Sequence, residues 1–305
     1  MSDRRLPPER LEARSAEIGG GLTIRRALPN RHRRTVGAWC FLDHAGPMEF
    51  AADGGMHVGP HPHIGLQTFT WMIEGEVVHR DSLGNEQVIT PGQVNLMTAG
   101  AGIAHAEDSA PGRAGRLHAA QLWIALPEGQ RRRPPAFRNY PQLPLVESGG
   151  FSVRVLAGSA FGQTSPAEVY SPLVGLDLSA AGPAAMRIPL DASFEHAALV
   201  LSGAASVGGE TLAPGTLLYY APGRAELTLE SDSAARILLI GGTPFGEEIL
   251  VWWNFVARTR EEMAEATRDW NAGRRFGPVH GSPAPPLVAP DVAGLKLRAA
   301  PPGVT

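Results

Sequence analysis

From Leu66 onward the chain is a succession of short apolar segments that end at glycine or proline. The segments LQTFTWMIE, VNLM, IAHAED and LHAAQLWIAL alternate apolar and polar residues or are apolar throughout. The chain contains 36 Gly and 27 Pro, scattered along its whole length. Short strands at regular spacing with glycine and proline corners are typical of β-barrels and β-sandwiches. The sequence therefore predicts an all-β fold.

The second half of the chain repeats the first half imperfectly. The segment WMIEGEVV…ITPGQVNLMTAG is similar to LVLSGAASVGGETLAPGTLLYYAPG. Three glycine pairs align the two halves: Gly75 with Gly203, Gly92 with Gly215, and Gly100 with Gly223. A repeat of this kind predicts two tandem barrels, each built from one copy of the same unit.

The domain boundaries follow from changes in composition. We expect a first barrel at residues 20–135 and a second, with a C-terminal helix, at residues 150–281. Residues 127–150 are rich in Pro and Arg and lack periodicity, so they are expected to be a linker. Residues 282–305 form a Pro/Ala-rich tail that is expected to be poorly ordered up to the segment LKLRA.

Two pairs of potential metal ligands lie in the first half. His61 and His63 occur in GPHPHIG, and His105 and Glu107 occur in GIAHAED. Residues two positions apart on a β-strand point to the same face, so each pair can aim at one point. A lone histidine in a strand is more often a packed or surface residue. Two pairs beside glycine corners predict instead one mononuclear metal site.

The second half lacks this set of side chains. Counting from the matched glycines, the four positions correspond to Pro189, Asp191, Thr228 and Glu230. None of them carries an imidazole, so we expect the second barrel to be metal-free.

The ligand set restricts the chemistry of the metal. Three imidazoles and one carboxylate leave one or two coordination positions open, as in the related sites that bind non-haem Fe(II) and activate O₂. We therefore expect Fe(II). Zinc accepts the same donors, so Zn, Mn, Cu, Ni and Co remain alternatives.

The two ends of the chain depart from the strand pattern. Residues 1–20 are charged and contain proline, and we expect them to be weakly helical or disordered. Residues 259–273, TREEMAEATRDWNAG, predict a helix with a capping box formed by Thr259 and Glu262 and a stop at Gly273. One face of this helix is expected to dock on a sheet: Met263, Ala266, Thr267 and Trp270.

Charge and composition exclude several classes of protein. The net charge of -3 argues against direct binding of nucleic acid. No apolar run reaches the roughly 18 residues of a membrane-spanning helix, and the N-terminus lacks the apolar stretch of a signal peptide. Cys40 is the single cysteine, so it forms no internal disulfide, and we expect a buried inert thiol. These features favour a cytoplasmic protein.

The spacing of the ligands resembles known motifs. Gly55, His61, His63 and Gly75 are similar to the first cupin motif, which also has a glutamate where this chain has Gln67. The pairing of HPHIGLQT with TAGAGIAHAE resembles the pirin family, as does the later run WWNFVARTREEM…DW…GRRFGPV. In that family the glutamate of HAE is a ligand, so Glu107 supplies the carboxylate that Gln67 does not.

The resemblance covers residues 20–281 and has consequences for fold and function. It implies a bicupin fold with iron in the first barrel, held by His61, His63, His105 and Glu107. It implies a quercetin 2,3-dioxygenase activity for some members. For those members the substrates are a small polyphenol and O₂. In this chain we expect Glu107 to act as the general base.

Other members of the family act as transcription coregulators or modulators of enzymes. The alternative function is therefore a non-catalytic, redox-sensing metal protein that binds a regulatory protein partner. Eukaryotic pirins carry Arg and Glu at the positions of Ile64 and Gln67. This difference weakens the case for the partner-binding surface in this chain.

Several further residues near the motifs have open roles. Four histidines lack a comparable partner and are expected in loops or behind the ligands, with His57 and His118 closest to the site: His44, His57, His79 and His118. Gln67 and Gln121 either donate hydrogen bonds near the metal or are ordinary strand residues. Four large side chains are expected in the barrel core rather than on a substrate-binding wall: Phe69, Trp71, Met97 and Trp123.

Overall fold

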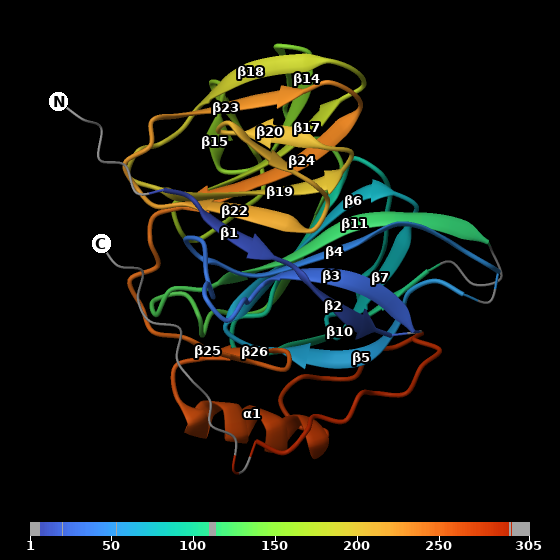
Figure 1. Ribbon diagram of the computed structural model, residues 1–305. Coiled ribbons are helices and arrows are strands. Elements are labelled where there is room, and N and C mark those ends of the chain that lie inside the picture. Colours follow the sequence, from blue (N-terminus) through green and yellow to red (C-terminus); the bar gives the residue numbers. More distant parts are fainter. Residues whose placement is uncertain (1–6, 20, 53, 110–113, 293, 295–305) are drawn as a thin grey trace.

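The computed structural model describes residues 7–19, 21–52, 54–109, 114–292 and 294. Two β-barrels lie one on the other, and Figure 1 shows the first in blue to green below the second in yellow to orange. The one helix of the described chain, α1 (Arg260–Asn271), lies beneath the first barrel. The predicted all-β fold with two tandem barrels and a C-terminal helix is confirmed.

The first barrel consists of two facing sheets. Its strands are β2 (Arg14–Ile18), β3 (Leu22–Leu28), β4 (Trp39–Phe50), β5 (His57–His63), β6 (Leu66–Glu74), β7 (Val77–Asp81), β8 (Glu86–Ile89), β9 (Val94–Thr98), β10 (Ile103–Asp108), β11 (Gly115–Ala125) and β12 (Ala136–Tyr140). One sheet has the order β12-β9-β6-β11-β4-β3-β2 and the other β5-β10-β7-β8. All the pairings are antiparallel, so each strand alternates between an inner and an outer face.

The second barrel repeats this arrangement. Its strands are β1 (Glu9–Glu12), β13 (Leu145–Ser148), β14 (Phe151–Ala157), β17 (Leu173–Ala180), β18 (Ala184–Pro189), β19 (Glu195–Ser202), β20 (Ala205–Val207), β21 (Glu210–Leu212), β22 (Thr216–Tyr220), β23 (Glu226–Ser231) and β24 (Ala235–Gly242). The sheet orders are β1-β22-β19-β24-β17-β14-β13 and β18-β23-β20-β21. A separate small hairpin joins β15 (Ser159–Ala160) to β16 (Gln163–Thr164).

Two segments differ from their sequence-based expectation. The described part of residues 1–20 is neither helical nor disordered, because β1 pairs with β22 of the second barrel and β2 pairs with β3. The expected linker at 127–150 contains β12 and β13, one edge strand for each barrel. These strands have four or five residues, too few for a periodic pattern, and their ladders come from distant partners.

The two barrels share a large apolar core. Trp39, Phe69 and Trp71 are each at most 1% exposed and face the second barrel. The Trp39 indole donates to the carbonyl oxygens of Val174 and Gly241, at 3.3 and 3.2 Å. Burial of side chains of this size stabilises a fold by roughly 1.5–3 kcal/mol each. The barrels are therefore one structural unit.

The chain returns from the second barrel to the first through β25 (Leu250–Trp252), β26 (Phe255–Ala257) and α1. Thr259 caps the helix, because its hydroxyl accepts from the Glu262 N–H at 3.2 Å. The Glu262 carboxylate accepts from the Arg258 N–H, at 2.9 Å, and not from that of Thr259 as in a standard capping box.

The buried face of α1 packs on the outside of the first barrel. Met263 and Ala266 are fully buried in a cluster with Phe255 of the hairpin and Ile64 and Ala104 of the first barrel. The helix therefore docks on strands, as expected. These strands are β26 of the C-terminal hairpin and the strands that carry the candidate metal ligands.

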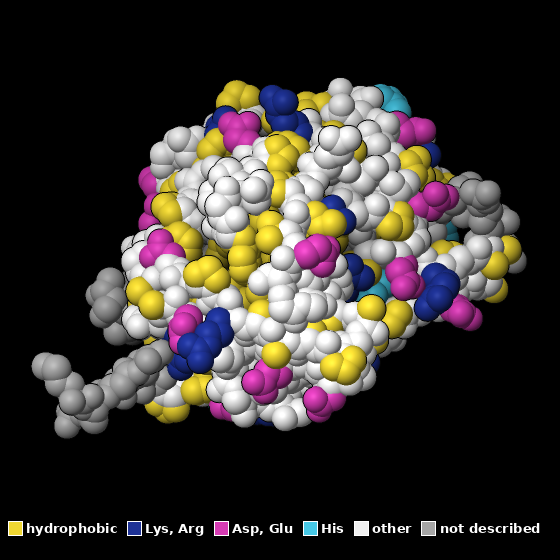
Figure 2. Space-filling view, turned by 90° about the horizontal axis from the view of Figure 1, so that it is seen from above, with side chains coloured by type: hydrophobic (Ala, Val, Ile, Leu, Met, Phe, Trp, Pro, Cys, Tyr) yellow, Lys and Arg dark blue, Asp and Glu magenta, His cyan; other side chains and the backbone are white. Residues whose placement is uncertain are grey.

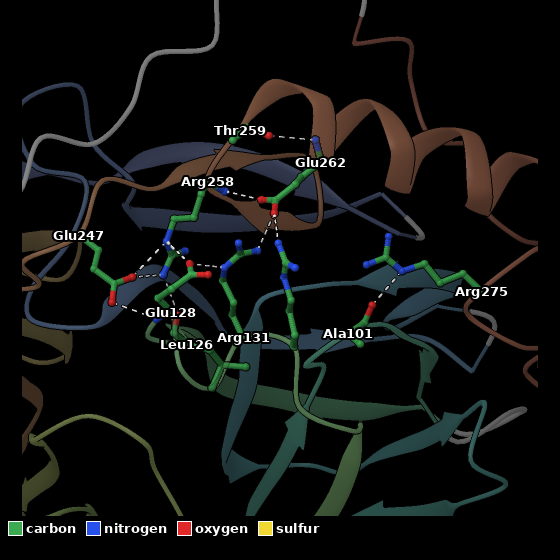
Figure 3. Close-up of polar contacts among 10 residues, drawn as sticks. Ala101, Leu126, Glu128, Arg131, Glu247, Arg258, Thr259, Glu262 and Arg275 are labelled. Atoms are coloured by element: carbon green, nitrogen blue, oxygen red, sulfur yellow. Dashed lines mark hydrogen bonds and ion pairs between the residues drawn. The ribbon is translucent and has the colours of Figure 1, made fainter.

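Charged side chains connect this C-terminal segment to the loop that follows β11 of the first barrel (Figure 3). Arg258 donates to the Leu126 carbonyl at 2.8 Å and also bonds the Glu247 carboxylate. Arg131 donates to Glu262 at 2.8 Å. Because these groups are half-buried or buried, their contacts are less weakened by solvent than exposed ion pairs. They hold the β25–β26 hairpin in place.

The described part of the tail, residues 282–292, continues along the same face. Leu287 donates its N–H to the Pro60 carbonyl at 2.9 Å, and the Trp270 indole donates to the Leu287 carbonyl at 2.6 Å. The expectation of poor order is therefore wrong for residues 282–292. The segment LKLRA lies outside the described residues.

The face at the second-barrel end carries no dominant charge. Figure 2 shows Lys and Arg side chains interspersed with Asp and Glu over this face, with small apolar patches between them. No helix of the described chain is long and apolar enough to cross a membrane.

Candidate metal centre

The predicted histidines meet in the first barrel. β5 and β10 are antiparallel neighbours, and His61 lies directly opposite His105. His61, His63 and His105 each offer a ring nitrogen, and these nitrogens lie within 4.8 Å of one another. The three rings are buried, with at most 6% exposure. The alternation of side chains on two paired strands thus brings both motifs to one point.

Hydrogen bonds determine which nitrogen of His61 and His63 is available. The Nδ1 atom of His61 lies 2.9 Å from the Gly59 carbonyl, and that of His63 lies 2.8 Å from the Asn254 carbonyl. A carbonyl only accepts, so each Nδ1 carries the proton. Each Nε2 is then an unprotonated lone pair.

His105 is oriented by a chain of side chains. Its Nδ1 lies 3.3 Å from His79 Nδ1, and His79 Nε2 lies 3.1 Å from the Asp81 carboxylate. Because the carboxylate accepts from His79 Nε2–H, the His79 Nδ1 is the acceptor and His105 Nδ1 the donor. His105 therefore also presents an unprotonated Nε2.

These lone pairs converge and fit a metal cation. The Nε2 atoms of His63 and His105 are 3.0 Å apart, and by the assignment above neither carries a proton to share. Two nitrogens at the roughly 2.1 Å of a metal–imidazole bond, at a right angle, lie about 3.0 Å apart. Burial lowers the pKa of His61 to about 4 and holds the pKa values of His63 and His105 well below their usual value, so the rings are neutral at pH 7. The neutral imidazole is the form that binds metals.

Glu107 belongs to the same cavity but is less close than the histidines. It lies opposite His79 on β7, with 8% exposure, and its carboxylate is outside the 4.8 Å group. β5 carries a bulge between Val58 and His61, so the register with β10 shifts between His105 and Glu107. Burial, and then the neighbouring Asp108 charge, raise the pKa of Glu107 to about 7.

A cavity of about 450 Å³ opens from these residues into the barrel. Its walls are mostly apolar, with Ile24, Met72 and Leu117 among them. Trp123 also lines it, stacked on Phe41 with ring centroids 4.0 Å apart. The cavity is large enough for a small aromatic molecule.

The remaining predicted residues separate into two groups. Gln121 lines the cavity, where it accepts from Thr70 Oγ1 at 2.7 Å. Gln67 points away from it and donates to Thr98 and to the Glu168 carbonyl. Trp123 belongs to the buried core, as expected, and also lines the cavity. Phe69, Trp71 and Met97 are buried in the core as well.

The remaining histidines differ from the expectation that His57 and His118 lie closest to the site. His118 pairs with His44 outside the cavity, their Nε2 atoms 2.9 Å apart. His57 contacts Asp108 at 3.3 Å and does not line the cavity. His79, which was not singled out, is the one that contacts a ligand. The signal was present, because His79 and Asp81 are a further pair two positions apart on a strand.

Sequence reasoning also missed the contribution of the C-terminal hairpin. Trp252, Trp253 and Asn254 line the cavity, although they follow the second barrel in sequence. Trp253 has a positive φ of 50°, an uncommon conformation for a non-glycine residue. Cys40 is fully buried, and burial raises its pKa to about 12, as expected for an inert thiol.

The positions counted as counterparts in the second barrel do not face its interior. Pro189, Asp191 and Glu230 are exposed, and Thr228 is half-buried. The inward residues of these strands are apolar, including Ile188 opposite Leu227. Counting through gaps misplaced the match by one residue, and a shift of one reverses the face of a strand.

Two family models match the chain. The model described as Pirin matches residues 21–124, and the model described as Pirin C-terminal cupin domain matches residues 175–277. The first match lies within the first barrel, and the second covers most of the second barrel together with β25, β26 and α1.

Relatives that align over most of their length support the same family. A Pseudomonas aeruginosa protein named "putative quercetin 2,3-dioxygenase" is 54% identical over 93% of this chain and 90% of its own length. A Caulobacter vibrioides protein named "Pirin-like protein" is 37% identical over 86% of this chain and 92% of its own.

Solved structures show the same fold. A crystal structure of quercetin 2,3-dioxygenase from Acinetobacter baumannii has 50% identity and a TM-score of 0.93, over 96% of this chain and 98% of that one. A bacterial pirin from Escherichia coli in complex with nickel(II) has 21% identity and a TM-score of 0.62, over 78% of this chain and 99% of that one, and shows the fold alone. With both family models matched and the relatives aligned over nearly their whole length, this chain belongs to the pirin family.

Proposed function

We propose that this protein is a metal-dependent dioxygenase that opens the ring of a flavonol with O₂, as in quercetin 2,3-dioxygenase. The observation that carries the proposal is the convergence of three unprotonated histidine nitrogens at the end of a cavity walled by aromatic rings. The names of the relatives at 54% and 50% identity support the same reaction class.

His61, His63, His105 and Glu107 are the proposed ligands of the metal, and Fe(II) is the proposed ion. When bound, Fe(II) supplies charge stabilisation and redox chemistry with O₂. The protein contributes neutral imidazoles whose orientation is set by Gly59, Asn254 and His79. Such supporting hydrogen bonds orient a ligand and raise its basicity.

Glu107 is the proposed general base. It would take the proton of the flavonol 3-hydroxyl. The ring then opens with one O₂, and the products, a depside and carbon monoxide, together contain all the atoms of flavonol and O₂.

The cavity supplies binding and exclusion of water. The stacked Phe41–Trp123 pair offers a flat face for a flavonoid ring. The hairpin residues Trp252 and Trp253 line the cavity from the opposite end of the sequence. An apolar site strengthens the polar contacts made inside it.

The test combines metal analysis with a flavonol assay. Protein loaded with Fe(II) under anaerobic conditions should consume O₂ and bleach quercetin absorbance on exposure to air, with carbon monoxide as a product. Loading with Zn, Mn, Cu, Ni or Co establishes which ion supports turnover. Absence of turnover with every flavonol and every ion at high protein concentration would contradict the proposal.

Variants separate the metal site from the base. The His61→Ala/His63→Ala protein should lose stoichiometric metal, and metal retained there would contradict the ligand assignment. Glu107→Gln should reduce turnover more than about a hundredfold, the range expected for a general base. Metal content measured on the same variant distinguishes loss of the base from loss of a ligand. His57→Ala is the matched control, because His57 lies outside the cavity and should change neither property.

A further inference from the structure

A groove lined by arginines adjoins the mouth of the cavity. We call it the arginine groove, and its charged lining residues are Arg10, Glu12, Arg14, Arg26, Arg31 and Arg34. It has a volume of about 630 Å³. Arg14, Arg26 and Pro29 line both the groove and the cavity, so the two spaces are neighbours that share a wall.

The positive charge of the groove is only partly neutralised. Glu12 pairs with Arg10 at 3.2 Å. Asp43, a cavity residue, pairs with Arg26 through two bonds of 2.7 and 2.6 Å. Arg14 and Arg34 form no hydrogen bond or ion pair with any residue that the structure describes.

The groove also contains Arg31, whose guanidinium donates to His32 and meets no described carboxylate. Arg31 and Arg34 are therefore left without a carboxylate partner among the described residues, and Arg14 shares the charge of Asp43 with Arg26 without contacting it. This accumulation differs from the mixed charges of the face in Figure 2.

Aromatic rings connect the groove to the metal-binding histidines. The Arg26 guanidinium lies 4.5 Å from the Phe41 ring centroid. Phe41 stacks on Trp123 at 4.0 Å, and Trp123 meets the edge of the His63 ring at 5.2 Å. A planar ligand that lies along this wall has one end at the histidines and the other at the arginines.

We propose that the substrate is an aromatic molecule with an anionic group, a sulfonate, sulfate or carboxylate, bound by Arg14 and Arg34 in the arginine groove. The inference rests on the proposed function and specifies its substrate class. Guanidinium groups bind planar or tetrahedral oxyanions through paired, charge-assisted hydrogen bonds. A neutral flavonol would leave these arginines without a ligand, whereas an anionic one can place its ring in the cavity and its anionic group on the arginines at the shared wall.

The experiment compares binding of quercetin with that of quercetin 5′-sulfonate, a matched pair that differs in one anionic group. Binding is measured by quenching of tryptophan fluorescence, under anaerobic conditions and with metal-loaded protein, so that no turnover is needed. The sulfonate should bind about tenfold more tightly at low salt, and raising the ionic strength from 0.02 to about 0.3 M should remove most of this difference.

Two variants locate the effect. Arg14→Gln/Arg34→Gln should bind quercetin like the wild type but lose the preference for the sulfonate. Arg187→Gln is the control, because Arg187 is an exposed arginine of the second barrel paired with Glu226. It should keep the full preference.

The outcomes separate this inference from the proposed function. Equal affinity for the two ligands, or a preference that survives in the double variant, would overturn the anion site. Failure of both ligands to bind would overturn it as well. Preferential binding without any turnover would leave the anion site supported and contradict only the oxygenase.

Discussion

The two barrels have the same architecture and opposite interiors. Both combine a seven-stranded and a four-stranded sheet, with matching strand orders. In the first barrel the cross-strand pair His61–His105 faces a cavity of about 450 Å³. In the second, the pair Ile188–Leu227 faces a packed apolar core. One backbone thus supports either a site or a filled core, and the inward side chains decide which.

The comparison also shows that a cavity reduces the packing contacts of the side chains around it. Interior side chains of the second barrel have neighbours on every side, which maximises dispersion contacts. Those of the first barrel face open space and buried polar groups. We expect the second barrel to contribute more to stability and the first to carry the function. Substitutions in each barrel test this division.

The first prediction contrasts the cross-strand pairs directly. His105→Ala should lower metal affinity by more than about a hundredfold, because even residues that only support a ligand contribute 10–100-fold. Its matched partner, Leu227→Ala, should retain stoichiometric metal. Competition with a chelator measures the affinity, and loss of metal in the Leu227 variant would break the contrast.

Truncation of the same residue type in each barrel tests the packing difference. Leu229 lies in the filled core, and Leu117 lines the cavity; both are at most 1% exposed. Leu229→Ala should cost about 3–5 kcal/mol and Leu117→Ala about 2 kcal/mol, since the latter loses fewer contacts. Chemical denaturation of the metal-free proteins measures both. A larger loss at Leu117 would reverse our view of the two interiors.

The buried carboxyl of Glu107 should make the metal-free first barrel sensitive to pH. Burial raises its pKa from 4.5 to about 7, so the folded state holds this proton more tightly than the unfolded state. The stability it contributes is present below pH 4.5 and is lost as the pH rises through 7, by up to about 3 kcal/mol. Glu107→Gln should remove that loss in metal-free protein. An unchanged pH dependence of unfolding would exclude Glu107 as its source.

His79 should support the metal site without being a ligand. His79→Ala removes the acceptor for His105 Nδ1–H, and metal affinity should fall about 10–100-fold with little change in the fold. His79→Gln, whose side-chain oxygen also accepts a hydrogen bond, should recover part of the affinity. Chelator competition gives both values, and wild-type affinity in His79→Ala would remove this residue from the site.

The smallest effect concerns a polar residue in the filled barrel. His196 is 1% exposed, and neither of its ring nitrogens has a hydrogen-bond partner among the described residues. Burial lowers its pKa to about 4, so it is neutral at pH 7. His196→Leu should stabilise the protein by about 1 kcal/mol, because an unpartnered buried polar group is unfavourable. A destabilised variant would show that the imidazole has a role in this core.

Local patterns in the sequence were sufficient for much of this description. The alternation of apolar residues and the glycine corners predict the strands, and the capping residues of 259–273 predict α1 within one residue at its start. The two ligand pairs lie on β5 and β10 as expected, and the histidines meet because neighbouring strands keep their register. These features depend on residues close in sequence.

Other features depend on contacts between distant residues. β1 and β12 are too short to be recognised, because their backbone hydrogen bonds come from partners elsewhere in the chain. Phe69 and Trp123 lie on paired strands with similar patterns, yet one faces the second barrel and the other the cavity. Alternation shows that two faces exist but not what each face meets.

The sequence by itself therefore determined the strands, the repeat and the identity of the candidate ligands. The tertiary structure decided how those ligands are supported. Asn254 bonds His63 across 191 positions, and the β25–β26 hairpin that carries it lines the first barrel after passing through the second. Such a contact depends on the packing of the whole chain. Every residue has a backbone carbonyl, so the sequence does not show which carbonyl accepts from His63.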